Sequence, residues 1–464
     1  MLNDKESPFT LTLTDSGLSL PVVSFDGEEA LNQPYRFDLE LIGLAPAMAP
    51  GALLQQPAFL RLDEQHGIHG VIDSASYEHR GTHRIGYRLS LMPHLQRLAQ
   101  PDKRRVFVQS SVPQILQQLL VENALVADDY RIEMTVGHYP RRPFCIQYEE
   151  SDLALLNRLC EEEGIHYHFE HRADGHVVVF ADDSLSLPQT PVSVPFKAGE
   201  QTPSPCISAL YQHHHAAPIC ALRTVRDRGQ PASSDAAANQ RMADPPPRPA
   251  PEQRHHEQRS RRHLERQRGQ HRTINGRCDQ SGLFSGDLLQ VSAHPISHFN
   301  EQWRITAIRH RGQHPSILDP SPSVHRYYND FCAQPWSSDF RPALKQPRPS
   351  IAGFHLARVV GSTGQPAQMD EHGRIAISLW PAAQAPMHDS DTLWLPVAMT
   401  RTQCRLTPAD LPCAGSEVWV SFLDGDPDRP ILCLGNSPDP APRPPPPACD
   451  NGLLLDWLLN RAEP

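Results

Sequence analysis

Three consecutive glutamates followed by two alternating histidines are the residues here that could do chemistry. Glu161, Glu162 and Glu163 precede His166 and His168, and carboxylates with imidazoles can act as acid/base groups or bind a metal ion. Consecutive carboxylates on a helix point in different directions, however, and we expect this helix end to be solvated. The two histidines share one strand face, but a zinc site needs three or four converging ligands. We therefore predict neither a catalytic nor a metal site.

Two other kinds of cluster contain imidazole or guanidinium groups. Runs of consecutive histidines, which allow adventitious binding of nickel or zinc, are formed by His213, His214 and His215 and by His255 and His256. Arginines gather in a basic run over residues 254–272, which could hold phosphate or an acidic protein surface. This run has no interleaved aromatics to stack on bases, so a solvated flank or a protein contact is favoured. Its arginines include Arg259, Arg261, Arg262, Arg266 and Arg268.

Motifs and composition argue against most enzyme classes. No G-x-S-x-G, Walker A or H-E-x-x-H motif occurs, and residues 448–464, after a proline-rich stretch, are too few for a glycosidase domain. Ten cysteines without a C-x-x-C pair predict reduced, mostly buried thiols. We expect no enzyme and no cofactor.

Length, apolar content and net charge predict a globular chain. The 464 residues have room for about three domains, 39% of residues are apolar, and the net charge of −10 argues against a nucleic-acid partner. The N-terminus has no basic stretch leading into an apolar segment, and no run approaches the roughly 20 apolar residues of a membrane span. We expect synthesis in the cytoplasm, no stable membrane insertion, and any export without a signal peptide.

The elements that position these residues follow from periodicity. Alternating apolar runs between residues 9 and 98 predict an all-β lobe, which we expect to be a barrel. Ser111 can cap a helix over residues 113–122, and Ser151 a second helix that closes at Gly164. The buried stripe of the second helix is formed by Leu155, Leu156, Leu159 and Cys160. Residues 165–180 predict a hairpin.

The C-terminal half alternates between unusual composition and strand signals. Residues 232–272 contain few large aliphatic side chains and predict an exposed, partly mobile excursion with room for a short solvated helix. Strand patterns return at residues 288–291 and 303–307, and a proline-rich linker follows at 339–349. Residues 354–434 hold about five strand candidates, the size and strand count of an OB-fold.

Two long blocks resemble the VgrG family of type VI secretion tip proteins. Residues 415–431 read GSEVWVSFLDGDPDRPI, similar to the family signature GxEVxVxFxxGDPDRPI, in which Asp424 and Gly425 supply a corner with positive φ. Residues 149–169 resemble the family segment ESDxxFLxRLxEEEGIxYxF. The segment 294–310 resembles HPxxxxNxxWxxTxxxH, and residues 370–375 resemble DxxGRV. Residues 379–381 replace the usual FPWD, and residues 400–412 lack the customary Trp/Gly-rich loop.

The resemblance implies a mainly β fold with a few helices (α+β), in which phage-tail-hub-like β-barrel lobes precede an OB-fold. The expected domains are a hub-like region over residues 1–338 with two barrel lobes and a helix/hairpin insert, a linker over 339–353, an OB-fold over 354–437, and a proline-rich tail over 438–464 with a short apolar segment. Family members usually continue into a β-helix needle, so we expect a short form without one.

The implied function is a structural tip or spike of a type VI secretion system. A homotrimeric hub would cap the secreted tube protein, carry a tip or effector cargo protein, and leave the cytoplasm through the apparatus. The alternatives are a phage-type tail lysozyme or hydrolytic effector, and a defective or adaptor-type paralogue that only binds cargo. We also expect a helix after Asn451 to dock on a partner surface.

Overall fold

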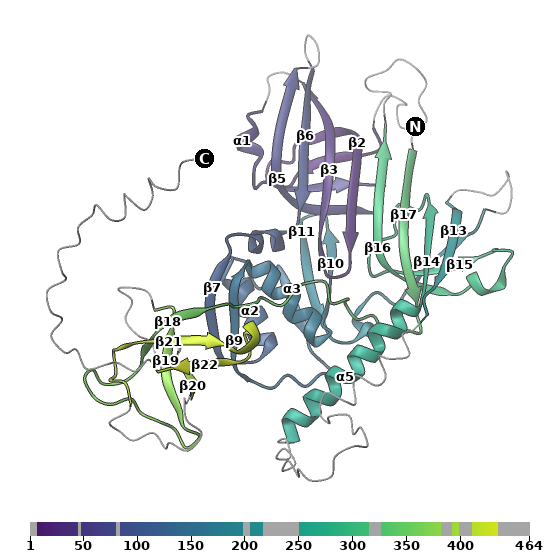
Figure 1. Cartoon of the computed structure of the whole chain (residues 1–464). Helices are drawn as coiled ribbons and strands as arrows, with labels where there is room; N and C mark the ends of the chain where they lie inside the picture. The colour runs from purple at the N-terminus through teal and green to yellow at the C-terminus, as the bar shows by residue number, and fades with distance from the viewer. Residues whose placement is uncertain are drawn as a thin grey trace, which may run out of the picture. The chain divides into compact units, whose positions relative to one another are not determined.

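The computed structural model describes residues 7–44, 48–79, 84–197, 205–216, 250–314, 326–381, 392–398 and 411–434. The chain divides into two compact units, Met1–Pro349 and Ser350–Pro464. Strands dominate both units and a few helices accompany the first (Figure 1). The expected mainly β fold with few helices is confirmed.

A closed barrel of six antiparallel strands opens the first unit. Its strands follow one another around the ring in the order β1-β4-β5-β6-β3-β2. They are β1 Thr10–Leu13, β2 Ser19–Ala30, β3 Gln33–Leu44, β4 Pro57–Arg61, β5 Gly67–His79 and β6 Arg84–Met92. Alternate residues such as Phe37, Leu39 and Leu41 point inward and are buried, as the period of a strand requires. Two short helices, α1 Pro50–Leu53 and η1 His94–Ala99, flank the barrel.

A second barrel is joined to the first by the pairing of its strand β16 with β2. The antiparallel pairing of β2 passes from β1 at residues 19–21 to β16 at residues 24–30, and an isolated bridge between Phe196 and Ile207 joins the two ends of the second ring. The strands of this ring are β12 Pro191–Pro195, β13 Ile207–His214, β14 Arg272–Cys278, β15 Leu288–Ser292, β16 Gln302–Gln313 and β17 Arg326–Pro335, with η3 Ser297–Phe299 beside them. Trp303 lies fully buried in its core.

Between the barrels the chain forms a helix and hairpin insert. The predicted helices are confirmed as α2 Val112–Glu122 and α3 Asp152–Glu163, and the hairpin as β10 His166–Arg172 with β11 Gly175–Ala181. Strand β8 Tyr130–Glu133 pairs with β11, strands β7 Lys103–Ser110 and β9 Arg142–Glu150 pair with each other, and η2 Ser184–Ser186 follows β11. Ser151 accepts a hydrogen bond from the N–H of Ala154, and Gly164 ends α3 at φ 69°.

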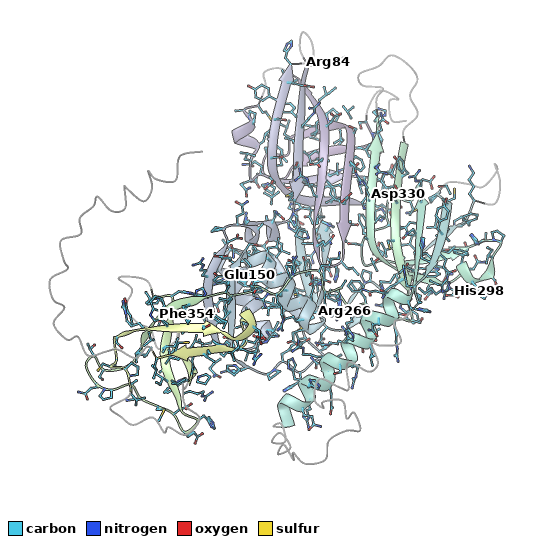
Figure 2. All side chains as sticks on the ribbon, in the orientation of Figure 1. Arg84, Glu150, Arg266, His298, Asp330 and Phe354 are labelled. Atoms are coloured by element: carbon cyan, nitrogen blue, oxygen red, sulfur yellow. The ribbon has the colours of Figure 1, made fainter. Side chains whose placement is uncertain are left out.

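The expectation of an exposed, partly mobile excursion with a short solvated helix is wrong for the second half of residues 232–272. Residues 250–271 form α5 (Ala250–His271), a helix of 22 residues, whereas residues 232–249 lie outside the described part. The helix has no apolar stripe, but it is not simply solvated, because Arg262 and Arg266 are buried against the insert (Figure 2). Composition could not show this, since arginine is rarely buried unless it is paired.

The second unit contains a closed barrel of five strands in the order β18-β19-β20-β22-β21. They are β18 Phe354–Val359, β19 Arg374–Leu379, β20 Thr392–Ala398, β21 Glu417–Phe422 and β22 Pro430–Cys433, with η7 Leu423–Gly425 between the last two. The expected corner is confirmed, because Asp424 and Gly425 have φ of 58° and 70°. Assignment to the OB-fold stays a prediction.

The expectations for residues 400–410 and for the tail after residue 434 lie outside the described residues. None of the described helices is long and apolar enough to cross a membrane.

Candidate functional site

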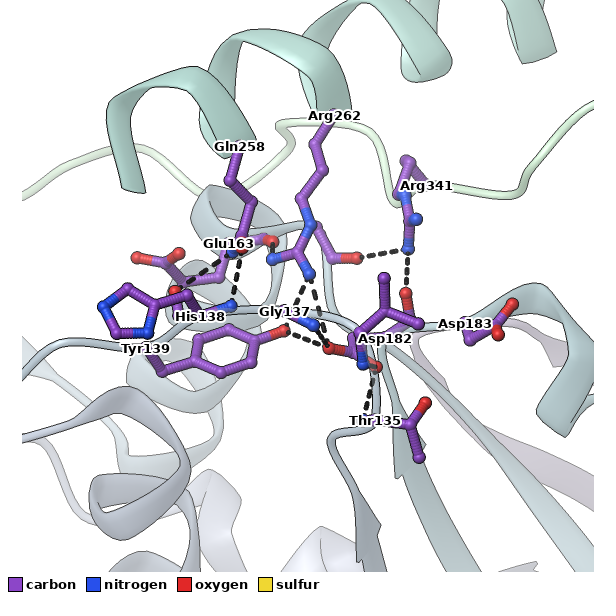
Figure 3. A network of polar contacts seen from close by, with 12 residues as sticks. Thr135, Gly137, His138, Tyr139, Glu163, Asp182, Asp183, Gln258, Arg262 and Arg341 are labelled. Atoms are coloured by element: carbon purple, nitrogen blue, oxygen red, sulfur yellow. Dashed lines mark hydrogen bonds and ion pairs between the residues drawn. The ribbon is translucent and has the colours of Figure 1, made fainter. Parts of the chain in front are cut away.

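The C-terminal end of α3, which carries the three glutamates, meets α5 and the segment 341–348. Backbone carbonyls in the last turn of a helix have no partner within the helix. Here arginines supply the donors: Arg262 donates to the carbonyl of Glu163, and Arg266 Nη2 donates to the carbonyl of Glu161 over 2.7 Å. Arg341 Nη1 adds a bond of 3.2 Å to the carbonyl of Gly164 (Figure 3). Cations at this helix end also oppose its partial negative charge.

Glu161 and Glu163 are buried and the side chain of Glu162 is only 7% exposed, so the expectation of a solvated helix end is wrong. Glu163 lies 2.6 Å from Arg142 and 2.8 Å from His255. Burial alone would raise the pKa of Glu163, but the hydrogen bond from His255 and the charge of Arg142 outweigh it and lower the pKa to about 2. Glu161 accepts hydrogen bonds of 2.8 Å from the backbone N–H groups of Lys345 and Gln346.

The glutamates nevertheless point apart, as expected. Glu161 turns to the backbone of the 341–348 segment and Glu163 to Arg142 and α5, while Glu162 reaches Arg348 over 2.9 Å. Each carboxylate is held by cations or N–H groups of this chain, and the geometry does not join them with His166 and His168. The contacts join the end of α3 to α5 and to the segment 341–348.

Asp182, which the sequence did not single out, anchors the other side of this junction. Its carboxylate is fully buried and accepts bonds from the N–H groups of Thr135 at 3.0 Å and Gly137 at 2.5 Å. The Tyr139 hydroxyl donates over 3.0 Å, and Arg262 Nη2 lies at 3.5 Å (Figure 3). Burial opposes ionisation, but the backbone N–H groups prevail and lower the pKa of Asp182. No motif marks such a residue, since its partners come from distant segments.

The two histidines of β10 are buried apart from the glutamates. His166 and His168 are 0% and 2% exposed, and their rings stack with centroids 6.5 Å apart. Burial lowers the pKa of His168 to about 4. Of the other candidate histidines, His255 joins Glu163, and the carbonyl of His215 accepts a bond of 2.5 Å from His271. The structure does not bring His213, His214 and His215 together with His255 and His256.

A second group of histidines, which sequence reasoning missed, lies between the first barrel and the β10–β11 hairpin. We call it the histidine cluster, and its members are His69, His94, His171 and His176. His69 Nδ1 and His176 Nδ1 are 3.0 Å apart, and His176 Nε2 accepts from the N–H of His94 over 3.0 Å. Among the described residues no three His, Cys, Asp or Glu side chains are arranged to hold a metal ion.

The outer face of the sheet that contains β3, β2 and β16 has broad, shallow surfaces. Two hollows of about 720 Å³ each lie over β2 and β3, one beside β14 and β17 and the other beside β5 and β6. Their walls carry ion pairs across neighbouring strands, with Asp26 and Arg309 at 2.7 Å and Arg277 and Asp330 at 2.7 Å. A mixed-charge face of this kind suits contact with protein rather than the chemistry of a small substrate.

Comparisons with known proteins show the family of this chain. Residues 28–316 match the family of the phage tail baseplate hub. The type VI secretion system spike proteins VgrG5 and VgrG4b of Pseudomonas aeruginosa are 36% and 34% identical to this chain. Each alignment covers 94% of this chain, but 58% and 57% of the relative. The chain therefore spans little more than half the length of these curated relatives.

A solved structure has a similar fold. It is an E. coli protein described as a component of the type VI secretion system with structural similarity to the T4 bacteriophage tail proteins gp27 and gp5. The TM-score is 0.69 at 23% identity, and the match covers 91% of this chain and 98% of that one.

Proposed function

The chain belongs to the phage tail baseplate hub family, with VgrG spike proteins among its relatives, and we propose that it is a structural tip component of a type VI secretion system. The match over residues 28–316 carries this proposal, because it includes strands of both barrels of the first unit, from the end of β2 to β16. The pairing of β2 in the first barrel with β16 in the second supports a rigid hub, since neither barrel can rotate without breaking this pairing.

In the proposed assembly three chains form a homotrimer. Two barrels per chain then give a six-part ring that can match a hexameric tube. One face of the ring docks on the secreted tube protein and the other carries a tip or an effector cargo protein, so that contraction drives the assembly outward. The chain waits in the cytoplasm and leaves through the apparatus.

The proposed domain roles follow the expected boundaries. Residues 1–338 form the hub, 339–353 connect it to an OB-fold over 354–437, and residues 438–464 contribute a proline-rich tail whose apolar segment docks on cargo. The order of strands in the five-stranded barrel supports the OB assignment, because such folds close a Greek-key barrel with five strands.

The oligomeric state tests the proposal. Size-exclusion chromatography coupled to light scattering should give three times the chain mass of 51.9 kDa. A clean monomer at micromolar concentration would favour the defective or adaptor-type paralogue.

The enzymatic alternative, a phage-type tail lysozyme or hydrolytic effector, has a separate test. The buried carboxylates of the junction are already bonded within the chain, and the relatives named above are spike proteins. We therefore propose a non-enzymatic role. Purified protein should release no soluble fragments from murein, and release above that of a heat-inactivated control would establish the alternative.

A further inference from the structure

Arg304, near the start of β16, is a buried cation without a close anion among the described residues. It is 3% exposed and donates through Nη1 to the carbonyls of Pro188 and of Gly286, the latter over 2.8 Å. Among the described residues no carboxylate oxygen lies within the 4.0 Å of an ion pair. Asp287 opposes the effect of burial on Arg304 from further away, yet burial raises the pKa of Asp287 itself to about 7. The charge of Arg304 is thus only partly compensated at neutral pH.

Arg304 lines a pocket of about 260 Å³ at the end of β17. Leu185 and Trp336 also line it, and they are 69% and 47% exposed, which is unusual for side chains of this size. Ser184 and Ser338 add hydroxyl groups, and Asp339 adds one carboxylate. The volume is below the roughly 300–1,000 Å³ of small-molecule pockets and suits one inserted side chain.

Gln189 holds the position that an anion would take. Its Oε1 accepts two long bonds, one from Arg304 Nη2 at 3.4 Å and one from Trp336 Nε1 at 3.3 Å. A carboxylate could accept from the same two donors through charge-assisted bonds, which are shorter and roughly twice as strong as neutral ones. Gln189 is exposed, but its Nε2 also donates to the carbonyls of Ser184, Leu185 and Leu187, so a carboxylate that enters must displace these bonds as well.

We propose that this pocket binds the side-chain carboxylate of an aspartate or glutamate that is flanked by apolar residues in a partner protein. Arg304 and the Trp336 indole N–H hold the carboxylate, and Leu185 with the Trp336 ring cover the apolar neighbours. Asp339 disfavours a doubly charged phosphate more than a singly charged carboxylate. The site lies within one chain and goes beyond the proposed hub role, since it needs neither trimer formation nor secretion.

Titration of the full chain with two peptides tests this site. Acetyl-Leu-Glu-Leu-amide and acetyl-Leu-Gln-Leu-amide differ only in charge, and NMR titration at millimolar concentration can follow the indole N–H signal assigned by Trp336→Phe. We expect the glutamate peptide to bind at least about tenfold more tightly, because only it replaces the neutral acceptor with an anion.

Three variants test the peptide binding while leaving the buried Arg304 in place. Gln189→Glu places a carboxylate beside Arg304 and should weaken binding of the glutamate peptide at least about tenfold, whereas Gln313→Glu, an exposed and distant match in charge, should leave it unchanged. Asp339→Asn should strengthen binding. Equal binding of both peptides, or undiminished binding by Gln189→Glu, would overturn the proposal. So would acetate or inorganic phosphate competing as well as the peptide, since the pocket would then hold an adventitious ion only.

Discussion

Two regions of the first unit bury ionisable side chains, and they avoid the cost of an unpaired buried charge in opposite ways. At the end of α3, ionised Glu163 and Asp182 are surrounded by arginines and N–H donors. In the histidine cluster the imidazoles stay neutral, and the ring nitrogens of His171 have no hydrogen-bond partner in the described structure. Burying a charge is costly unless it is paired, whereas a group that can lose its charge can be buried without a counter-ion.

The difference determines how each region responds to perturbation. The α3 junction depends on every partner being present, because removing one leaves a charge or carbonyl without compensation. The histidine cluster depends on pH instead, because protonation would create several buried charges, and among the described residues only His94 has a carboxylate close by, Asp129 at 3.5 Å. The variants below separate these two kinds of dependence.

The largest effect is expected from Arg262→Met, which removes the cation shared by Asp182, Tyr139 and the Glu163 carbonyl. Breaking a buried ion pair costs about 3–5 kcal/mol of stability. Denaturant unfolding measures the change. The matched control is Arg261→Met, because Arg261 is the adjacent, exposed residue of α5. Its expected change in stability is within about 0.5 kcal/mol. Equal stability of the two variants would show that the paired charges do not hold α5.

Leu156→Ala tests the apolar side of the same helix and should destabilise by about 2–5 kcal/mol through lost burial and a cavity. Leu155, Leu156, Leu159 and Cys160 are all fully buried, which confirms the predicted stripe. The midpoint and slope of denaturant unfolding give the change. A loss below about 0.5 kcal/mol would mean that the junction alone fixes α3.

Mild acid should destabilise the histidine cluster before it affects the junction. Burial, with neighbouring imidazoles, lowers the pKa of His69 to about 4 and of His176 to about 2, against 6.5 for the free side chain. The unfolded chain therefore binds protons first, and stability falls as pH decreases from 6.5 towards 4. Glu163, with a pKa of about 2 against 4.5, loses its contribution only below pH 4.5. Unfolding midpoints at pH 7.5, 5.5 and 3.5 check this order, and equal stability at the first two would contradict it.

The smallest effect at neutral pH is expected from His171→Phe. The imidazole is fully buried with a pKa of about 4, lowered by burial, and a ring of similar shape loses no hydrogen bond that the described structure contains. We expect a change within about 1 kcal/mol at pH 7.5 and a shallower loss of stability between pH 6.5 and 4. A steeper loss would mean that His171 is not among the groups that resist protonation.

Local elements could be read from short segments. The cap at Ser151, the left-handed Gly164 and the positive φ of Asp424 and Gly425 each depend on residues within a few positions. The core face of α3 follows from its spacing of leucines. The pairing of β2 with β16 between the two barrels does not, because one strand pattern looks the same whichever neighbour it pairs with.

The sequence by itself therefore determined the elements, the apolar faces and the family resemblance. Only the tertiary structure decided which polar groups are buried. Glu163 and Arg262 stand about a hundred positions apart, and a glutamate at a helix end reads as solvated until the fold brings a cation to it. The physical reason is that the burial of a charge is stable only with its partners, and no local pattern specifies partners that come from distant segments.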